Sequence, residues 1–83
     1  MLELTVQRTA ADIMQECKRR GLVVKMETFE RKHNARHWHL GFTDQPGVLE
    51  VTELGGETVL KVADNRDCGW AKDFAQQLAR RGS

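Results

Sequence analysis

The chain has 83 residues, of which 40% are hydrophobic and 30% are charged, a length and composition typical of one small domain with one core. Thirteen basic and twelve acidic side chains give a formal net charge of +1, so global charge gives no reason to expect nucleic acid or an anionic membrane as a partner. No apolar run approaches the roughly 18 residues of a membrane span, and no signal peptide is evident. Two cysteines are too few for a disulfide framework, so we expect a cytoplasmic protein.

The N-terminal part of the chain predicts a strand followed by a helix. Apolar and polar residues alternate over residues 2–7, the period of two that is typical of a half-buried strand. Thr9 and Asp12 approximate a capping box, after which apolar residues recur at helical spacing. Gly21 is expected to end this helix.

Residues 22–64 hold four short segments rich in Val, Thr and aromatic residues, separated by turn signals, and they predict an antiparallel meander. The three expected turns are residues 31–35 with Glu30 opposite Arg36, residues 44–47 with Thr43 opposite Val48, and Gly55–Gly56 with Leu54 opposite Glu57. All three registers place one set of apolar side chains on the same face: Val24, Met26, Trp38, Leu40, Phe42, Leu49, Val51, Leu60 and Val62.

The last element is expected to be an amphipathic helix from about Cys68 to Arg81, with Asp67 as its N-cap. Gly82 is expected to stop it, or to form with Ser83 an added tail outside the fold. The sequence therefore predicts a single α+β domain over residues 1–83, in the order β-α-β-β-β-β-α. An antiparallel four-stranded meander plus the N-terminal strand would carry both helices on one face.

All three histidines lie within residues 31–39. His37 and His39 would project from one face of a strand about 7 Å apart, a reach over which such a pair can chelate zinc. The expected register adds Glu27 beside His39, which predicts a metal site of these three residues. The alternative is a solvated polar face with a cross-strand Glu27–His39 pair, since no fourth ligand is evident.

Basic side chains predict a second kind of site. The last helix is expected to finish near the first hairpin, so one basic end would hold Arg31, Lys32, Arg36, Arg80 and Arg81. Such an end would bind the phosphates of RNA or DNA, and the α-β-β-β-α order is similar, in topology alone, to double-stranded-RNA-binding domains. The alternative is a solvated surface, because no exposed aromatic side chain is expected there to stack bases.

Catalysis has little support in the sequence. Cys68 is expected in the first turn of a helix, a place that favours reactive thiols. No histidine is expected at that end of the sheet to serve as a base, and the chain lacks a P-loop, a dinucleotide fingerprint and a nucleophile elbow. We therefore expect a non-enzymatic protein without a cofactor, in which Cys68 is structural or incidental.

The sheet face opposite the helices is expected to be open. It would carry Phe29, Val48, Leu54 and Val59 among charged and polar residues that include His37, His39, Glu50 and Thr52, and the N-terminal strand would offer a free edge. A mixed apolar and charged face on a small protein favours contact with a second copy. We therefore expect an interaction module that forms a homo-oligomer, most simply a dimer, ahead of nucleic-acid binding and of metal binding.

Overall fold

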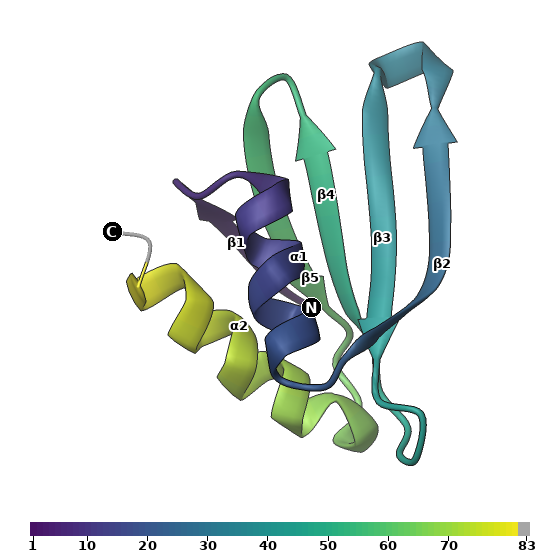
Figure 1. Ribbon diagram of the computed structural model, residues 1–83, viewed down its shortest axis with the longest axis vertical. Coiled ribbons are helices and arrows are strands. Elements are labelled where there is room, and N and C mark those ends of the chain that lie inside the picture. Colours follow the sequence, from purple (N-terminus) through teal and green to yellow (C-terminus); the bar gives the residue numbers. More distant parts are fainter. Residues whose placement is uncertain (82–83) are drawn as a thin grey trace.

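The computed structural model describes residues 1–81, without the side chain of Arg81; Gly82 and Ser83, expected as a helix stop or a tail, lie outside the described residues. Figure 1 shows an α+β fold. Its elements, in chain order, are β1 (Leu2–Val6), α1 (Ala10–Arg19), β2 (Val23–Glu30), the 3-10 turn η1 (Arg31–His33), β3 (Ala35–Gly41), β4 (Leu49–Leu54), β5 (Glu57–Val62), the 3-10 turn η2 (Arg66–Cys68) and α2 (Gly69–Arg81).

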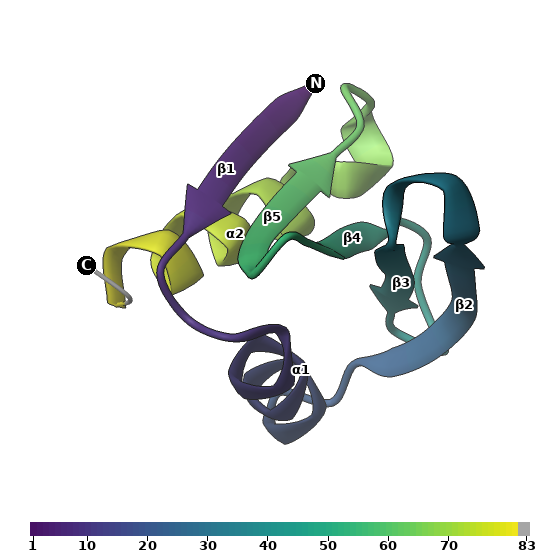
Figure 2. The same cartoon turned by 90° about the horizontal axis from the view of Figure 1, so that it is seen from above.

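All five strands form one antiparallel sheet in the order β1-β5-β4-β3-β2, with β1 and β2 at its edges. Figures 1 and 2 show α1 and α2 on the same side of this sheet. We call the side covered by the helices the inner face and the other side the outer face. The predicted fold, an antiparallel meander with an N-terminal strand and two helices on one face, is confirmed.

The core lies between the inner face and the two helices. Leu40, Leu49, Val51 and Leu60 from the three central strands are fully buried, and all four were expected on this face. They pack in one cluster with apolar side chains of both helices, among them Ile13, Cys17, Phe74, Ala75 and Leu78. Burial of these side chains is the main contribution that holds the sheet and the helices together.

The ends of α1 follow from its sequence. Thr9 caps the helix, because its hydroxyl accepts a hydrogen bond from the amide of Asp12 at 3.1 Å. Gly21 has a φ of +92°, and the next amide, that of Leu22, donates to the carbonyl oxygen of Cys17 at 3.0 Å. This is a Schellman motif, in which a glycine in the left-handed region closes the helix.

The start of the last helix differs from the prediction. Asn65, rather than Asp67, is the capping residue, because its side-chain oxygen accepts a hydrogen bond from the amide of Asp67 at 3.0 Å. The capped segment is the short turn η2, and α2 begins only at Gly69. An asparagine and an aspartate two residues apart are both good caps, and the first of them is used.

The β4–β5 hairpin has the predicted register. Leu54 lies opposite Glu57, and Glu50 lies opposite Lys61. Gly55 and Gly56 have φ values of +56° and +83°, as a two-residue type I′ turn requires.

The β3–β4 connection is longer than expected. Leu40 lies opposite Leu49, so the register differs by two residues from the predicted one, in which Leu40 would face Val51. Because side chains alternate between faces with a period of two, a shift of two leaves each apolar residue on its predicted face. The loop, residues 42–48, folds back against the start of α2, where Trp70 donates to the carbonyl oxygen of Pro46 at 3.0 Å.

The β2–β3 hairpin slips by one residue from the predicted register. Glu30 lies opposite Ala35 rather than Arg36, because Asn34 takes a left-handed conformation with a φ of +52° that closes a shorter turn. A slip of one moves every side chain to the opposite face. Phe29 therefore belongs to the inner face, and Met26 belongs to the outer face.

A β-bulge between Val24 and Met26 shifts the register by one more residue, so that it differs by two from the predicted one. Beyond the bulge, Val24 lies opposite Leu40 and is back on the predicted inner face. The bulge also interrupts the regular pairing of an edge strand, which limits how a further strand can add to it.

Candidate functional site

The three histidines form one side-chain network with two carboxylates on the outer face. Glu30 lies at the end of the network nearest to the turn η1. One of its carboxylate oxygens contacts His33 Nδ1, and the other lies 3.4 Å from His37 Nε2. Hydrogen bonds from His33 and His37 favour the charged carboxylate and hold the pKa of Glu30 below its usual value. The network thus joins the turn η1 to strand β3.

The rest of the network joins β3 to β4. Thr52 is buried and its hydroxyl lies 3.0 Å both from His37 Nδ1 and from Glu50 Oε2. The other oxygen of Glu50 lies 3.2 Å from His39 Nε2. Glu50 therefore contacts both strand histidines, directly or through Thr52.

The structure does not bring together the predicted metal ligands His37, His39 and Glu27. Glu27 lies opposite Trp38, on the inner face, and its carboxylate accepts a hydrogen bond from the Trp38 indole at 3.0 Å. The one-residue slip of β2 is the physical reason for this correction. Within residues 1–81, no group of three or more His, Cys, Asp or Glu side chains is arranged to hold a metal ion.

Sequence reasoning missed Glu50 as the partner of these histidines. The predicted β3–β4 register, two residues off, gave it no histidine opposite, whereas in the structure Glu50 lies directly opposite His39. The alternation of β4 did contain the signal, because Glu50 and Thr52 were expected on the same face as His37 and His39.

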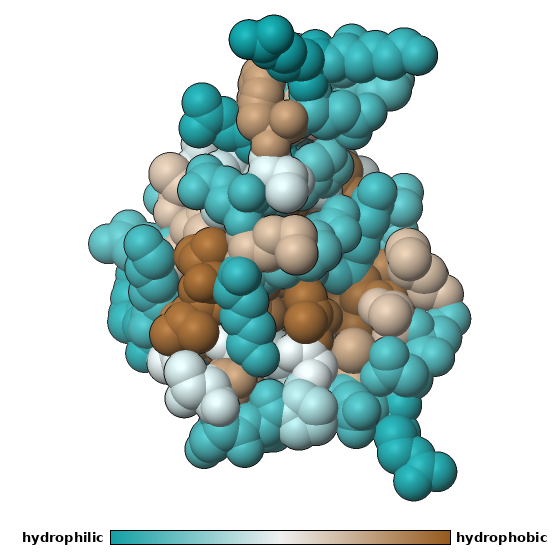
Figure 3. Space-filling view, turned by 90° about the vertical axis from the view of Figure 1, so that its right-hand side faces the viewer, coloured by the Kyte–Doolittle hydropathy of each residue, from teal (hydrophilic) through white to brown (hydrophobic). Residues whose placement is uncertain are grey.

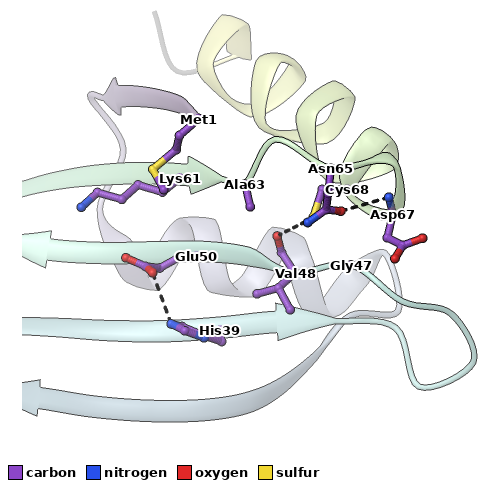
Figure 4. A pocket seen from close by; sticks show the side chains of 10 residues that line it. All are labelled: Met1, His39, Gly47, Val48, Glu50, Lys61, Ala63, Asn65, Asp67 and Cys68. Carbon is purple, nitrogen blue, oxygen red and sulfur yellow. Dashed lines mark hydrogen bonds and ion pairs between the residues drawn. The ribbon is translucent and has the colours of Figure 1, made fainter.

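A cavity of about 390 Å³ opens on the outer face next to this network. In Figure 4, His39 and Glu50 lie at one end of it, and Asn65, Asp67 and Cys68 lie at the other. The start of β4, the end of β5 and the connection that follows β5 line this cavity together, a tertiary arrangement without a signal in the sequence.

Both cysteines are buried free thiols. Cys68 ends the turn η2 instead of beginning a helix, is 4% exposed, and places its sulfur 4.0 Å from the carbonyl oxygen of Val48. His39 lines the same cavity, which corrects the expectation that no histidine lies at this end. Burial raises the pKa of the Cys17 thiol to about 12, so Cys17 stays protonated.

The predicted basic end does not form. Figures 1 and 2 place the turn η1, with Arg31 and Lys32, on the opposite side of the molecule from the end of α2, with Arg80. The reason is that α2 packs against β1, β4 and β5 and so runs away from the β2–β3 hairpin. Arg36 is the second residue of β3, near η1, and the side chain of Arg81 lies outside the described residues.

Strand β2 is the least covered element of the sheet. All eight of its residues are exposed, including four large apolar side chains: Val23 and Val24 at 39%, Met26 at 52% and Phe29 at 49%. Figure 3 views the molecule from the side of this strand and shows apolar groups separated by hydrophilic ones. Neither helix extends far enough to cover β2 (Figure 2).

The residues predicted for an oligomer interface are divided by the structure. Leu54, 44% exposed, and half-buried Val59 lie on the outer face as expected. Val48 is half-buried and lines the cavity. Phe29 belongs to the inner face, opposite Arg36, so these four side chains do not form one patch.

Comparisons with protein-family models, with curated proteins and with solved structures find no match for this chain. Among the described residues, no helix is both long and apolar enough to cross a membrane. The functional argument therefore depends on the geometry of the exposed surfaces.

Proposed function

We propose that this protein is a non-enzymatic interaction module that forms a homodimer through strand β2. The observation that carries this proposal is the exposure of all eight residues of β2. A strand that leaves several large apolar side chains in water lacks the burial that stabilises the rest of the sheet. Contact with a second copy would supply that burial.

The backbone of β2 supports an edge-to-edge contact. Among the described residues it pairs with β3 alone, so its other edge presents backbone groups that a further strand can pair with. The run Met26–Glu30, beyond the bulge, is regular. Antiparallel pairing of this run with the same run of a second copy would obey two-fold symmetry and extend the sheet across the dimer.

The other edge strand is a poorer interface. β1 is shorter than β2, and its apolar side chains Leu2, Leu4 and Val6 pack against or within the core. Its exposed side chains, such as Glu3 and Thr5, are polar. The edge of β1 was the alternative expected from the sequence, and the distribution of exposed apolar surface favours β2 instead.

The reducing interior of the cell suits such a module. Both thiols are free and buried in different parts of the fold, and neither requires oxidation for the fold to form. We therefore place the proposed homodimer in the cytoplasm.

Two matched substitutions test the dimer. Met26→Lys and Thr5→Lys each add one positive charge to an exposed outer-face position of an edge strand, the first on β2 and the second on β1. Light scattering at high micromolar concentration should give twice the 9.5 kDa chain mass for the wild type and for Thr5→Lys. Met26→Lys should give the mass of one chain with unchanged circular dichroism. A monomeric wild type, or dissociation caused by Thr5→Lys instead, would contradict the proposal.

A further inference from the structure

The tip of the β2–β3 hairpin combines an exposed aromatic ring with an arginine. Phe29 and Arg36 lie directly opposite each other, and the guanidinium carbon of Arg36 is 5.6 Å from the centroid of the Phe29 ring. Phe29 is 49% exposed, so much of its ring stays open to solvent. Phenyl rings and guanidinium planes are among the surfaces on which proteins stack unpaired nucleobases.

Two further cations follow Phe29 in the chain. Arg31 and Lys32 are exposed in the turn η1, and neither belongs to an ion pair among residues 1–81. Their acidic neighbour Glu30 is engaged by His33 and His37. Arg31 and Lys32 are therefore available for the phosphates of an extended strand.

We propose that this hairpin tip, defined as Phe29, Arg31, Lys32 and Arg36, binds single-stranded nucleic acid. One base would stack on Phe29 and Arg36, and the adjacent phosphates would contact Arg31 and Lys32. A single strand fits better than a duplex because the faces of paired bases are hidden inside the helix. The site is confined to the hairpin tip, so binding requires neither Arg80 nor a large positive net charge of the protein.

The neighbouring charges determine which residues of the hairpin tip are expected to contribute most to binding. Glu53 lies opposite Arg36 on β4, and its negative charge weakens the attraction of Arg36 for phosphate. Arg31 and Lys32 have no residue paired opposite them in the sheet. The charge contribution is therefore assigned to Arg31 and Lys32, and the stacking contribution to Phe29.

The test uses fluorescence anisotropy at low salt with labelled oligothymidylate, oligouridylate and a DNA duplex of mixed sequence. The double variant Arg31→Ala/Lys32→Ala should weaken single-strand binding about tenfold and reduce the slope of log K against log salt by about 1.4, or roughly 0.7 per lost phosphate contact. The control Lys18→Ala/Arg66→Ala removes the same charge from exposed positions at the other end of the sheet and should leave the slope unchanged. The two single strands distinguish DNA from RNA.

Phe29→Leu tests the stacking separately. It keeps an apolar side chain but removes the ring, and should weaken single-strand binding about fivefold or more. The proposed dimer would pair the run that contains Phe29, so the single chain is the form expected to bind. Met26→Lys, which is designed to separate the dimer, should therefore bind at least as tightly as the wild type, and failure of the dimer leaves this proposal intact. Absence of saturable binding, equal weakening by the control pair, duplex binding as tight as single-strand binding, or loss of binding in Met26→Lys would each overturn it.

Discussion

The indole nitrogen of Trp70 donates a hydrogen bond to the carbonyl oxygen of Pro46 at 3.0 Å, which ties the β3–β4 loop to the first turn of α2. Gly47, the residue after Pro46, has a φ of +108°. A Cβ there would lie 2.3 Å from the carbonyl oxygen of Asp67 and 2.4 Å from Trp70 Nε1. The loop thus approaches α2 so closely that only glycine fits at this position.

We expect Gly47→Ala to destabilise the protein more than Gly55→Ala. Gly55 also has a positive φ, of +56°, but a Cβ there meets nothing within 4 Å, so its replacement should cost only the backbone strain of about 1 to 2 kcal/mol. At Gly47 the same kind of strain is joined by displacement of backbone and ring atoms. Urea unfolding measures both free energies, and equal costs would show that the loop does not pack against α2.

The centre of the core offers a second test of the fold. Leu40 is fully buried on β3, whereas Leu54 on β4 is 44% exposed. Leu40→Ala should lower the free energy of unfolding by about 2 to 5 kcal/mol, because it removes buried apolar surface and leaves a cavity. Leu54→Ala should cost about 1 kcal/mol or less. Similar values for the two variants in chemical denaturation would argue against the observed inner face.

The architecture could be predicted from the sequence because the helix ends, the β4–β5 turn and the strand faces each have a local cause. Thr9 and Gly21 carry the chemistry of helix ends, and the Gly55–Gly56 pair permits only a narrow set of turns. The alternation of apolar residues then assigned the central strands to one face. An error of two residues in the β3–β4 register left that assignment unchanged, although it concealed the pairing of His39 with Glu50.

The site could not be predicted to the same degree, because its residues lie where a local signal was ambiguous. Five residues, 31–35, were expected to close the first hairpin, but Asn34 adopts a left-handed conformation and shortens the turn by one. That single difference exchanges the faces of Met26, Glu27 and Phe29. Asparagine tolerates this conformation better than most residues, so Asn34 was the available signal. The bulge after Val24 had no comparable signal.

The thiols provide a test that reports on burial alone. Cys17 is fully buried, with a pKa raised to about 12 by that burial, and Cys68 is 4% exposed. We expect both to react with a bulky aromatic disulfide reagent only at the rate of unfolding, and both to react at once in denaturant. The variants Cys17→Ser and Cys68→Ser assign the two rates. Rapid reaction of Cys68 in the native protein would instead support the reactive-thiol interpretation of its position.

Acid should weaken the ion pairs of Asp64, which lies in the connection between β5 and α2. Asp64 accepts a hydrogen bond from Lys72 Nζ at 2.7 Å and contacts the amino group of Met1. These two cations, Lys72 first, lower the pKa of Asp64 from 3.8 to about 2. A carboxyl whose pKa is lowered in the folded state stabilises the protein above its unfolded pKa, and this contribution is lost as the pH falls through the folded value.

The expected loss therefore falls between pH values of about 4 and about 2, the interval between the two pKa values of Asp64. Asp64→Asn removes the titrating group, so it should be less stable than the wild type at neutral pH and should lose less stability on acidification. Asp73→Asn is the matched control, because Asp73 is an exposed aspartate of α2 without an ion pair among residues 1–81. Urea midpoints measured across this pH range give the comparison. Because Asp64 is exposed to solvent, the difference in stability is expected to be small and to shrink with added salt. Parallel curves for the wild type and Asp64→Asn at low salt would show that the contact contributes nothing.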